Sequence, residues 1–351
     1  DLRGFGIQAL GNSSFFGLDL HALDLRDNQI SELPSFAFNR LRLSSPAALR
    51  LSGNPLHRVR DNGFVGAQFA EPAGSLRLDM LPLYSLGRRA FARLTLGSVN
   101  LTGSALGAVT EFAFDGLTVD QLLLRGCSNL TTVMGYGFTG LQLSGASNDG
   151  RSLDLSGLAI RAIHGMAFFG LDVDRLLLSG NRWRECVDGT FAGLTLPNPS
   201  GLHVQANPLV RLATGCTRDV KWRLTPPASV EVWNVSGTLD MRGLGVKWVE
   251  PHALSGVVTR TVDLRDNAIS TWHGYALYCV VTRSLLLQGN PLSTIDSYAA
   301  TGLQLQRARS RGRGSSPDSR VDLDADTLLF RPREDIRWEH RLLEAEEGLL
   351  R

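Results

Sequence analysis

The sequence lacks the features that mark several large classes of protein. Its 351 residues hold four cysteines, Cys127, Cys186, Cys216 and Cys279, without a C-x-x-C pair or zinc-ligand spacing, which argues against a zinc site and a dense disulfide scaffold. No apolar run approaches the roughly 18 to 20 residues of a membrane-spanning helix. Basic residues number 36 against 34 acidic ones, so a net charge of +2 gives no general attraction to nucleic acid or anionic membranes.

Signatures of catalysis are also missing. The chain has no P-loop, no G-x-G-x-x-G after a strand, no H-E-x-x-H and no G-x-S-x-G motif. The seven histidines are dispersed, and His164, His252 and His273 each stand alone. We therefore expect a protein that is not an enzyme, with no catalytic residues, no metal and no cofactor.

What the sequence does contain is one short pattern written many times. Clear copies are LDLRDNQI from Leu23, LLLSGNRW from Leu176 and VDLRDNAI from Val262. We number each copy from the second leucine of its L-x-L, which we call the anchor. The anchors predicted in this way are Leu2, Leu25, Leu51, Leu78, Leu96, Leu124, Leu155, Leu178, Val204, Met241, Leu264 and Leu287.

Other positions of the repeat hold the same kind of residue in most copies. An aliphatic residue stands two positions before every anchor from Leu25 onward. Most copies have an apolar residue eight positions after the anchor, such as Leu33, and many have a phenylalanine thirteen after it, such as Phe168. In a strand, the leucines of L-x-L share one face and the residues between them share the other. A single such strand cannot bury its leucines, so we expect the copies to stack into a parallel sheet with a continuous core.

Asparagine recurs three residues after the anchor, where its amide can both donate hydrogen bonds to buried backbone and accept them from it. We expect a structural role for this predicted ladder, which comprises Asn28, Asn54, Asn181, Asn207, Asn267 and Asn290. Ligand contact is the less favoured interpretation of these residues.

The full pattern, LxLxxNxLxxφxxxxFxxL, resembles the leucine-rich-repeat consensus. Copies containing AFFGL (167–171) or TFAGL (190–194) resemble the typical class found in toll-like receptors, Slit-like proteins and small matrix proteoglycans. The resemblance covers residues 1–303. It implies an α/β solenoid, a horseshoe of about twelve repeats, with a parallel β-sheet on the concave face and a mostly irregular or short helical convex side.

The spacing of the anchors predicts two irregular places. The gap from Leu78 to Leu96 is short, and we expect a kink there. The gap from Val204 to Met241 is long, and residues 213–238 within it are predicted to be irregular.

Beyond residue 303 the repeat pattern fails. Residues 304–320 form an Arg/Ser/Gly-rich linker, and 321–351 are predicted to hold a degenerate strand and an amphipathic C-terminal helix. The arginines of the linker could bind a polyanion such as heparin, although a solvated linker is the favoured interpretation. Asp322, Asp324 and Asp326 lack the glycine and glutamate of a calcium loop, so calcium is not expected.

The concave face is the predicted binding surface, because a row of strands about 4.8 Å apart suits a macromolecule better than a metabolite. Its alternating acids and arginines fit either a mixed-charge ligand surface or a ladder of salt bridges, and both remain open. Middle repeats with Gly126, Gly157 and Gly180 are predicted to be flatter and more apolar. The candidate ligand residues are Asp24, Arg26, Asp27, Arg50, Arg77, Asp79, Leu123, Arg125, Asp154, Leu177, His203, Gln205, Arg242 and Arg265.

Four N-x-S/T sequons, at Asn12, Asn100, Asn129 and Asn234, are glycosylation candidates and favour an extracellular location. We therefore expect an ectodomain of a cell-surface receptor or adhesion protein that binds a protein or other macromolecule. Nucleic acid is not an expected partner, and no part of this segment should insert into a membrane. The alternative is a cytoplasmic repeat scaffold or regulatory domain fused to an enzyme, which the scarcity of cysteine would suit.

Overall fold

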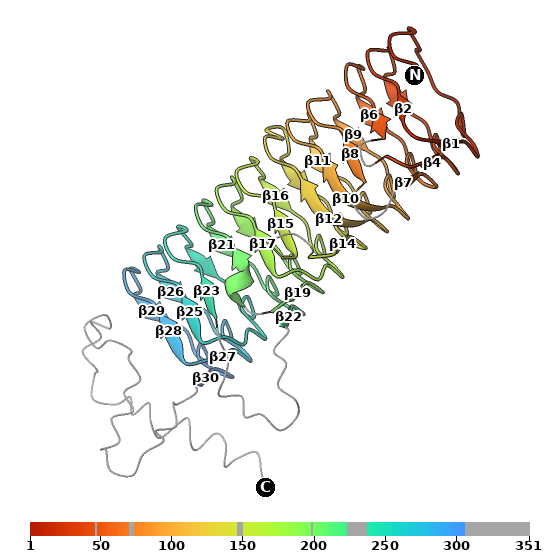
Figure 1. Ribbon diagram of the computed structural model, residues 1–351. Coiled ribbons are helices and arrows are strands. Elements are labelled where there is room, and N and C mark those ends of the chain that lie inside the picture. Colours follow the sequence, from red (N-terminus) through yellow and green to blue (C-terminus); the bar gives the residue numbers. More distant parts are fainter. Residues whose placement is uncertain (46–47, 70–73, 146–149, 198, 223–236, 306–351) are drawn as a thin grey trace, which may run out of the picture. The chain divides into compact units, whose positions relative to one another are not determined.

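Short parallel strands, stacked coil upon coil, make up a computed structural model of the protein (Figure 1). The structure describes residues 1–45, 48–69, 74–145, 150–197, 199–222 and 237–305. Each coil contributes strands to as many as three columns, which we call A, B and C. Within a column, strands pair in parallel with the equivalent strands of neighbouring coils, and each column is divided into several separate sheets. The chain is therefore a leucine-rich-repeat-like β-solenoid, as predicted.

Column A contains the L-x-L segments. Its leucines alternate with outward residues, and the inward ones, such as Leu76, Leu153 and Leu176, are fully buried. Its strands are β2 (Leu23–Asp24), β5 (Leu49–Arg50), β8 (Ser75–Arg77), β10 (Thr95–Asn100), β12 (Thr118–Leu123), β15 (Ser152–Asp154), β17 (Arg175–Leu177), β20 (Leu202–His203), β23 (Thr238–Asp240), β25 (Thr261–Asp263) and β28 (Ser284–Leu286).

Column B contains the apolar residue that lies about eight positions after the anchor. The strands are β3 (Glu32–Leu33), β6 (Arg58–Val59), β9 (Ser85–Leu86), β11 (Ala108–Val109), β13 (Thr132–Val133), β16 (Ala162–Ile163), β18 (Glu185–Cys186), β21 (Arg211–Leu212), β24 (Trp248–Val249), β26 (Thr271–Trp272) and β29 (Thr294–Ile295).

Column C follows the phenylalanine. It contains β1 (Asp19–Leu20), β4 (Arg42–Leu43), β7 (Gln68–Phe69), the first residues of β10 and β12, β14 (Gln142–Leu143), β19 (Thr195–Leu196), β22 (Lys221–Trp222), β27 (Val281–Thr282) and β30 (Gln304–Leu305). The convex side thus has strands where the sequence indicated irregular chain or short helices. In the described residues, the helical elements amount to one 3₁₀ turn, η1 (Pro199–Gly201).

The register of column A corrects one predicted repeat. Val99 pairs with Leu76 and Asn100 pairs with Arg77, so the anchor that follows Leu78 is Leu101, 23 residues later. Leu96 instead belongs to column C, where it pairs with Val119. The short gap predicted after Leu78 is wrong, and the basis for a kink there disappears with it.

Phenylalanine rings stack through the core from coil to coil. Eight of them form a continuous row with neighbouring ring centroids 5.4 to 6.0 Å apart, and they are Phe15, Phe38, Phe64, Phe91, Phe114, Phe138, Phe168 and Phe191. Face-on stacking follows from the repeat itself, because equivalent residues of adjacent strands lie directly above one another. Such pairs add about 0.5–1.5 kcal/mol each beyond the area they bury.

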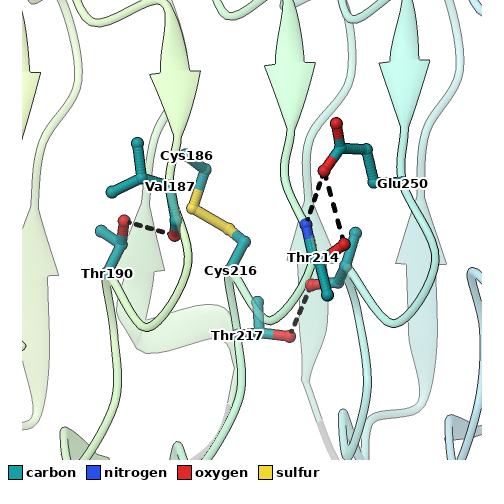
Figure 2. Close-up of a disulfide and its surroundings, with 8 residues drawn as sticks. Cys186, Val187, Thr190, Thr214, Cys216, Thr217 and Glu250 are labelled. Carbon is teal, nitrogen blue, oxygen red and sulfur yellow. Dashed lines mark hydrogen bonds between the residues drawn. A yellow bond between two sulfur atoms is a disulfide. The ribbon is translucent and has the colours of Figure 1, made fainter. Parts of the chain in front are cut away.

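A disulfide connects two neighbouring coils at the end of this row of rings. Cys186 in β18 bonds to Cys216 of the next coil, with Cα atoms 5.5 Å apart, and both residues are buried (Figure 2). Thr217 stands in the coil position that phenylalanine fills earlier, and its hydroxyl donates to the Ala253 carbonyl. Residues 213–222, predicted to be irregular, lie in this regular coil, where β22 pairs with β19. The rest of that prediction, 223–236, lies outside the described residues.

The asparagines of the ladder connect each coil to the one before it. The Asn181 amide nitrogen donates to the carbonyls of Leu155 and Leu178, both at 2.8 Å. Its oxygen accepts from the backbone nitrogens of Leu158 and Ile160. Asn28, Asn54, Asn207, Asn267 and Asn290 repeat this geometry.

Candidate ligand-binding face

The outward residues of column A form one long surface, which we call the LxL face and define as the residues immediately before and after each anchor. Strand register aligns the residues that precede the anchors: Asp24 lies opposite Arg50, and Arg77 lies opposite Asn100. All of these positions are at least partly exposed except Asp24 and Asp263, which are 7% and 5% exposed. Within each of the three sheets of column A, the stacking of strands therefore converts a repeated dipeptide into an outward row.

Thirteen of the fourteen predicted ligand residues lie on the LxL face. The exception is Asp27, which lies in the turn after the strand, with a positive φ of 56°. Its carboxylate pairs with Arg3 at 2.6 Å. Two residues of the face, Asn100 and Thr102, were missed because the repeat was anchored on Leu96. The signal was present, since V-N-L-T-G stands 23 residues after L-R-L-D-M.

Four aspartates and one asparagine of the face have a structural role at the ends of their strands. The Asp24 carboxylate accepts a hydrogen bond from the backbone nitrogen of Arg26 at 3.1 Å. The side-chain oxygens of Asn100, Asp154, Asp240 and Asp263 each accept in the same way from the residue two positions later. This is an Asx turn, in which a short polar side chain takes the place of a backbone acceptor. These side chains therefore shape the backbone as well as the surface.

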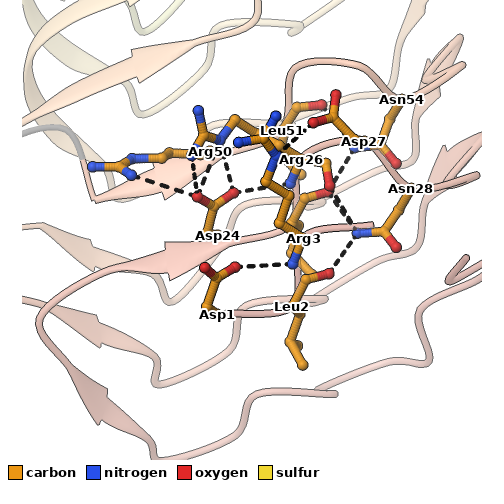
Figure 3. A network of polar contacts seen from close by, with 11 residues as sticks. Asp1, Leu2, Arg3, Asp24, Arg26, Asp27, Asn28, Arg50, Leu51 and Asn54 are labelled. Atoms are coloured by element: carbon orange, nitrogen blue, oxygen red, sulfur yellow. Dashed lines mark hydrogen bonds and ion pairs between the residues drawn. The ribbon is translucent and has the colours of Figure 1, made fainter. Parts of the chain in front are cut away.

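Arginines neutralise the acids at the N-terminal end of the face (Figure 3). Asp24 pairs with Arg26 at 2.5 Å and with Arg50 at 3.4 Å. The hydrogen bond from the Arg26 guanidinium is the main reason that the pKa of Asp24 falls well below its ordinary value, against the opposing effect of burial. Arg77 pairs with Asp79 at 3.2 Å and lowers the pKa of that carboxyl.

The same arrangement returns near the other end of the face. Asp263 pairs with Arg265 at 2.6 Å. Burial opposes ionisation of Asp263, yet hydrogen bonds from the Arg265 side chain and backbone outweigh it, so the pKa of Asp263 is lowered. Both ends therefore contain the salt-bridge ladder that was one of the two interpretations of this charge pattern.

Between these ends the face is less charged. Leu123 and Leu177 stand partly exposed in the row of residues that precede the anchors, and His203 lies opposite Leu177. Neutral polar residues follow four of the five anchors in this stretch, namely Thr102, Ser156, Ser179 and Gln205. The ion pair here joins Arg125 to Asp154 at 3.4 Å, and the Arg125 side chain is 79% exposed. This central stretch combines partly exposed leucines with neutral hydrogen-bonding groups, and it has fewer ion pairs than the charged coils on either side.

The glycines of the middle repeats have a backbone reason to be there. Gly126, Gly157 and Gly180 have φ values of 73°, 65° and 70°, and they occupy the turn that leaves column A. A left-handed conformation at this point favours glycine. Asp27, Met80 and Asp266 adopt similar φ values at the equivalent turn of other coils. The missing side chains therefore follow from the turn, and they are not in themselves evidence of a flat ligand surface.

The sequons lie in different surroundings. Asn12 and Asn129 are exposed, whereas Asn100 lies within β10 on the LxL face and is partly buried. Asn234 is outside the described residues, as are the linker after residue 305 and the predicted C-terminal strand and helix.

In the described coils, no group of three or more His, Cys, Asp or Glu side chains is placed to hold a metal ion. The described residues contain no helix that is long and apolar enough to cross a bilayer.

Comparison with known proteins assigns the chain to no family. No family model matches the chain, and no curated protein does. Seventeen chains of solved structures match, among them one from the crystal structure of a TLR13–ssRNA13 complex, with 16% sequence identity and a TM-score of 0.35. That match covers 85% of the present chain, which spans about half (54%) of the TLR13 chain. At this level the similarity says nothing about the ligand of the present protein.

Proposed function

We propose that the chain is the ligand-binding repeat domain of a cell-surface receptor or adhesion protein. A protein or other macromolecule would bind to the central stretch of the LxL face. The observation that carries this proposal is the distribution of charge on that face. Its ends bear buried or paired acids, whereas Leu123, Leu177 and His203 remain available between them. Partly exposed apolar residues within a polar rim are typical of docking surfaces.

The disulfide supports an extracellular location. Disulfides persist in secreted and surface proteins, while cytosolic thiols are kept reduced. The Cys186–Cys216 bond is buried between two coils, in the place of a core packing contact. The exposed sequons at Asn12 and Asn129 point in the same direction. Together they favour this location over the cytoplasmic scaffold.

Two experiments test the location. After expression in a secretory host, mass spectrometry should find glycan on Asn12 or Asn129, and a chain without glycan on any sequon would contradict a surface location. Thiol labelling of the unfolded, unreduced protein should leave Cys186 and Cys216 unmodified while it labels Cys127 and Cys279.

Surface variants test the use of the face. The labelled chain should bind to cells that express its ligand, and Leu123→Arg with Leu177→Arg should reduce this binding at least tenfold, because two cations would replace the apolar centre. The matched control places arginines on column B, as Thr132→Arg with Ala162→Arg. Equal loss in both variants, or loss in the control alone, would contradict the proposal. Glycan occupancy at Asn100 would also contradict it, because it would cover the same stretch of the face.

A further inference from the structure

Four basic side chains without an acidic partner lie on three of four neighbouring coils. They are exposed, and they make no side-chain hydrogen bond or ion pair in the described part of the chain. We call them the basic ridge, and its members are Arg161, Arg182, Arg184 and Lys247. They lie on the segment between column A and column B, away from the LxL face.

The fold brings these residues into one row. In their coil, Arg182 and Arg184 flank the buried Trp183, so both side chains point outward. The Arg182 nitrogen donates to the Ile160 carbonyl at 2.8 Å, which places the arginine pair beside Arg161 of the preceding coil.

Two further backbone hydrogen bonds continue the row. The Val210 nitrogen donates to the Arg184 carbonyl, and the Lys247 nitrogen donates to the Val210 carbonyl. With coils about 4.8 Å apart, the ridge is about 15 Å long.

The absence of acidic partners distinguishes the ridge from three arginines of earlier coils. On column B and the turn that follows it, Arg60 pairs with Glu32, Arg88 with Glu111, and Arg89 with Asp115. Next to the ridge, the Glu250 carboxylate is held by Arg211 at 2.7 Å and by the Thr214 nitrogen at 3.0 Å.

One other acid, Glu185, lies beside the ridge. It is exposed, and it contributes to the electrostatic field at Arg211. The local balance is therefore four cations against one free carboxylate.

We infer that the basic ridge binds a sulfated polysaccharide. An exposed row of cations favours a polyanion, and the planar guanidinium matches the oxygens of a tetrahedral anion. Trp248 follows Lys247 in the sequence and is 50% exposed, so an apolar ring lies beside the charges. A sugar ring can place its C–H face on such an indole while its sulfates meet the cations.

The choice of sulfated sugar over nucleic acid rests on the extracellular location proposed above. The binding site itself does not, because it is separate from the LxL face. If the LxL face does not bind a ligand, the ridge is unaffected, and if the ridge does not bind heparin, the LxL face is unaffected.

The test compares two triple variants of the full chain on heparin. The ridge variant is Arg161→Ser, Arg184→Ser and Lys247→Ser, and the control is Arg60→Ser, Arg88→Ser and Arg89→Ser. Both remove three positive charges. Both are made with Arg307, Arg309, Arg311 and Arg313 changed to serine, so that the arginine-rich tail does not mask the result. Circular dichroism and the thermal midpoint confirm that each variant is folded.

Heparin affinity is measured between low and physiological salt. The ridge variant should bind at least tenfold more weakly, and its slope of log affinity against log salt should fall by about three, one for each lost contact. The control should retain most of its affinity, because its arginines are already occupied by carboxylates. Trp248→Ala should weaken binding without changing the slope.

Two results would overturn the inference. Equal affinity of the two triple variants would show that heparin senses only total charge. Tighter binding of single-stranded DNA than of heparin by the unmodified chain, with the same loss in the ridge variant, would reassign the ridge to nucleic acid.

Discussion

Asn181 joins two coils through four hydrogen bonds, so Asn181→Ala measures how strongly the ladder couples the coils. The side chain is 5% exposed, and its four partners are the backbone groups of Leu155, Leu178, Leu158 and Ile160. Alanine removes the donor and the acceptor together. The surrounding leucines leave no polar group that could replace them.

The cost can be worked out from the groups left without partners. A buried backbone group that loses its hydrogen bond costs about 1–3 kcal/mol. Four such groups exceed the usual range for one substitution, and relaxation of the two coils recovers part of the loss. We therefore expect about 3–5 kcal/mol of destabilisation, at the upper end for point mutations.

Urea unfolding followed by far-UV circular dichroism gives the measurement. The control is Asn129→Ala, which changes an exposed asparagine in a turn and should shift stability by less than about 0.5 kcal/mol. Asn181→Asp should be nearly as harmful as alanine, because a carboxylate keeps the acceptor but cannot donate to the two carbonyls. A shift for Asn181→Ala as small as that of the control would refute the coupling role of the ladder.

Three further predictions concern the turns, the disulfide and pH. Gly289→Ala should lower the free energy of unfolding by about 1–2 kcal/mol, because φ is +75° and a Cβ would lie 2.3 Å from Oδ1 of Asp266. The control, Gly107→Ala, has open space around the new Cβ and should lower it by less. Cys186→Ser should lower the free energy of unfolding by about 2–4 kcal/mol, and a reducing agent should then have no further effect at this site. The lowered pKa of Asp263 stabilises the fold above its ordinary value of 3.8, and this stability is lost as the pH falls further. Asp263→Asn should therefore flatten the fall in thermal midpoint between about pH 4 and pH 2.

The repeat pattern predicted most of column A and the core. Leucine alternation fixed which face is buried, and the spacing of Phe168 and Phe191 from their anchors indicated that equivalent rings would meet. The pattern misplaced the anchor at Leu96 because L-T-L (94–96) is itself an L-x-L fragment. The strand β10 runs on from column C into column A, so it offers two candidate anchors. Pairing with the neighbouring coils decides between them, and pairing is a contact between residues far apart in sequence.

The candidate site was predicted less completely. The order of residues in the sequence located the outward row. It could not show that Asp24 is held by an Asx turn and by a guanidinium, whereas Leu123 is partly exposed and can contact a ligand. It also gave no sign that Arg161 and Lys247, 86 residues apart in the chain, lie on one ridge.

The sequence by itself determined that this chain repeats, which residues of each repeat turn inward, and that its strands are parallel. Those properties are local, because they follow from side-chain alternation and from a period close to 23 residues. Only the tertiary structure decided which charges are neutralised, that Cys186 meets Cys216, and where unpaired cations collect. Each of those outcomes depends on distances between neighbouring coils, and such distances exist only after the coils have stacked.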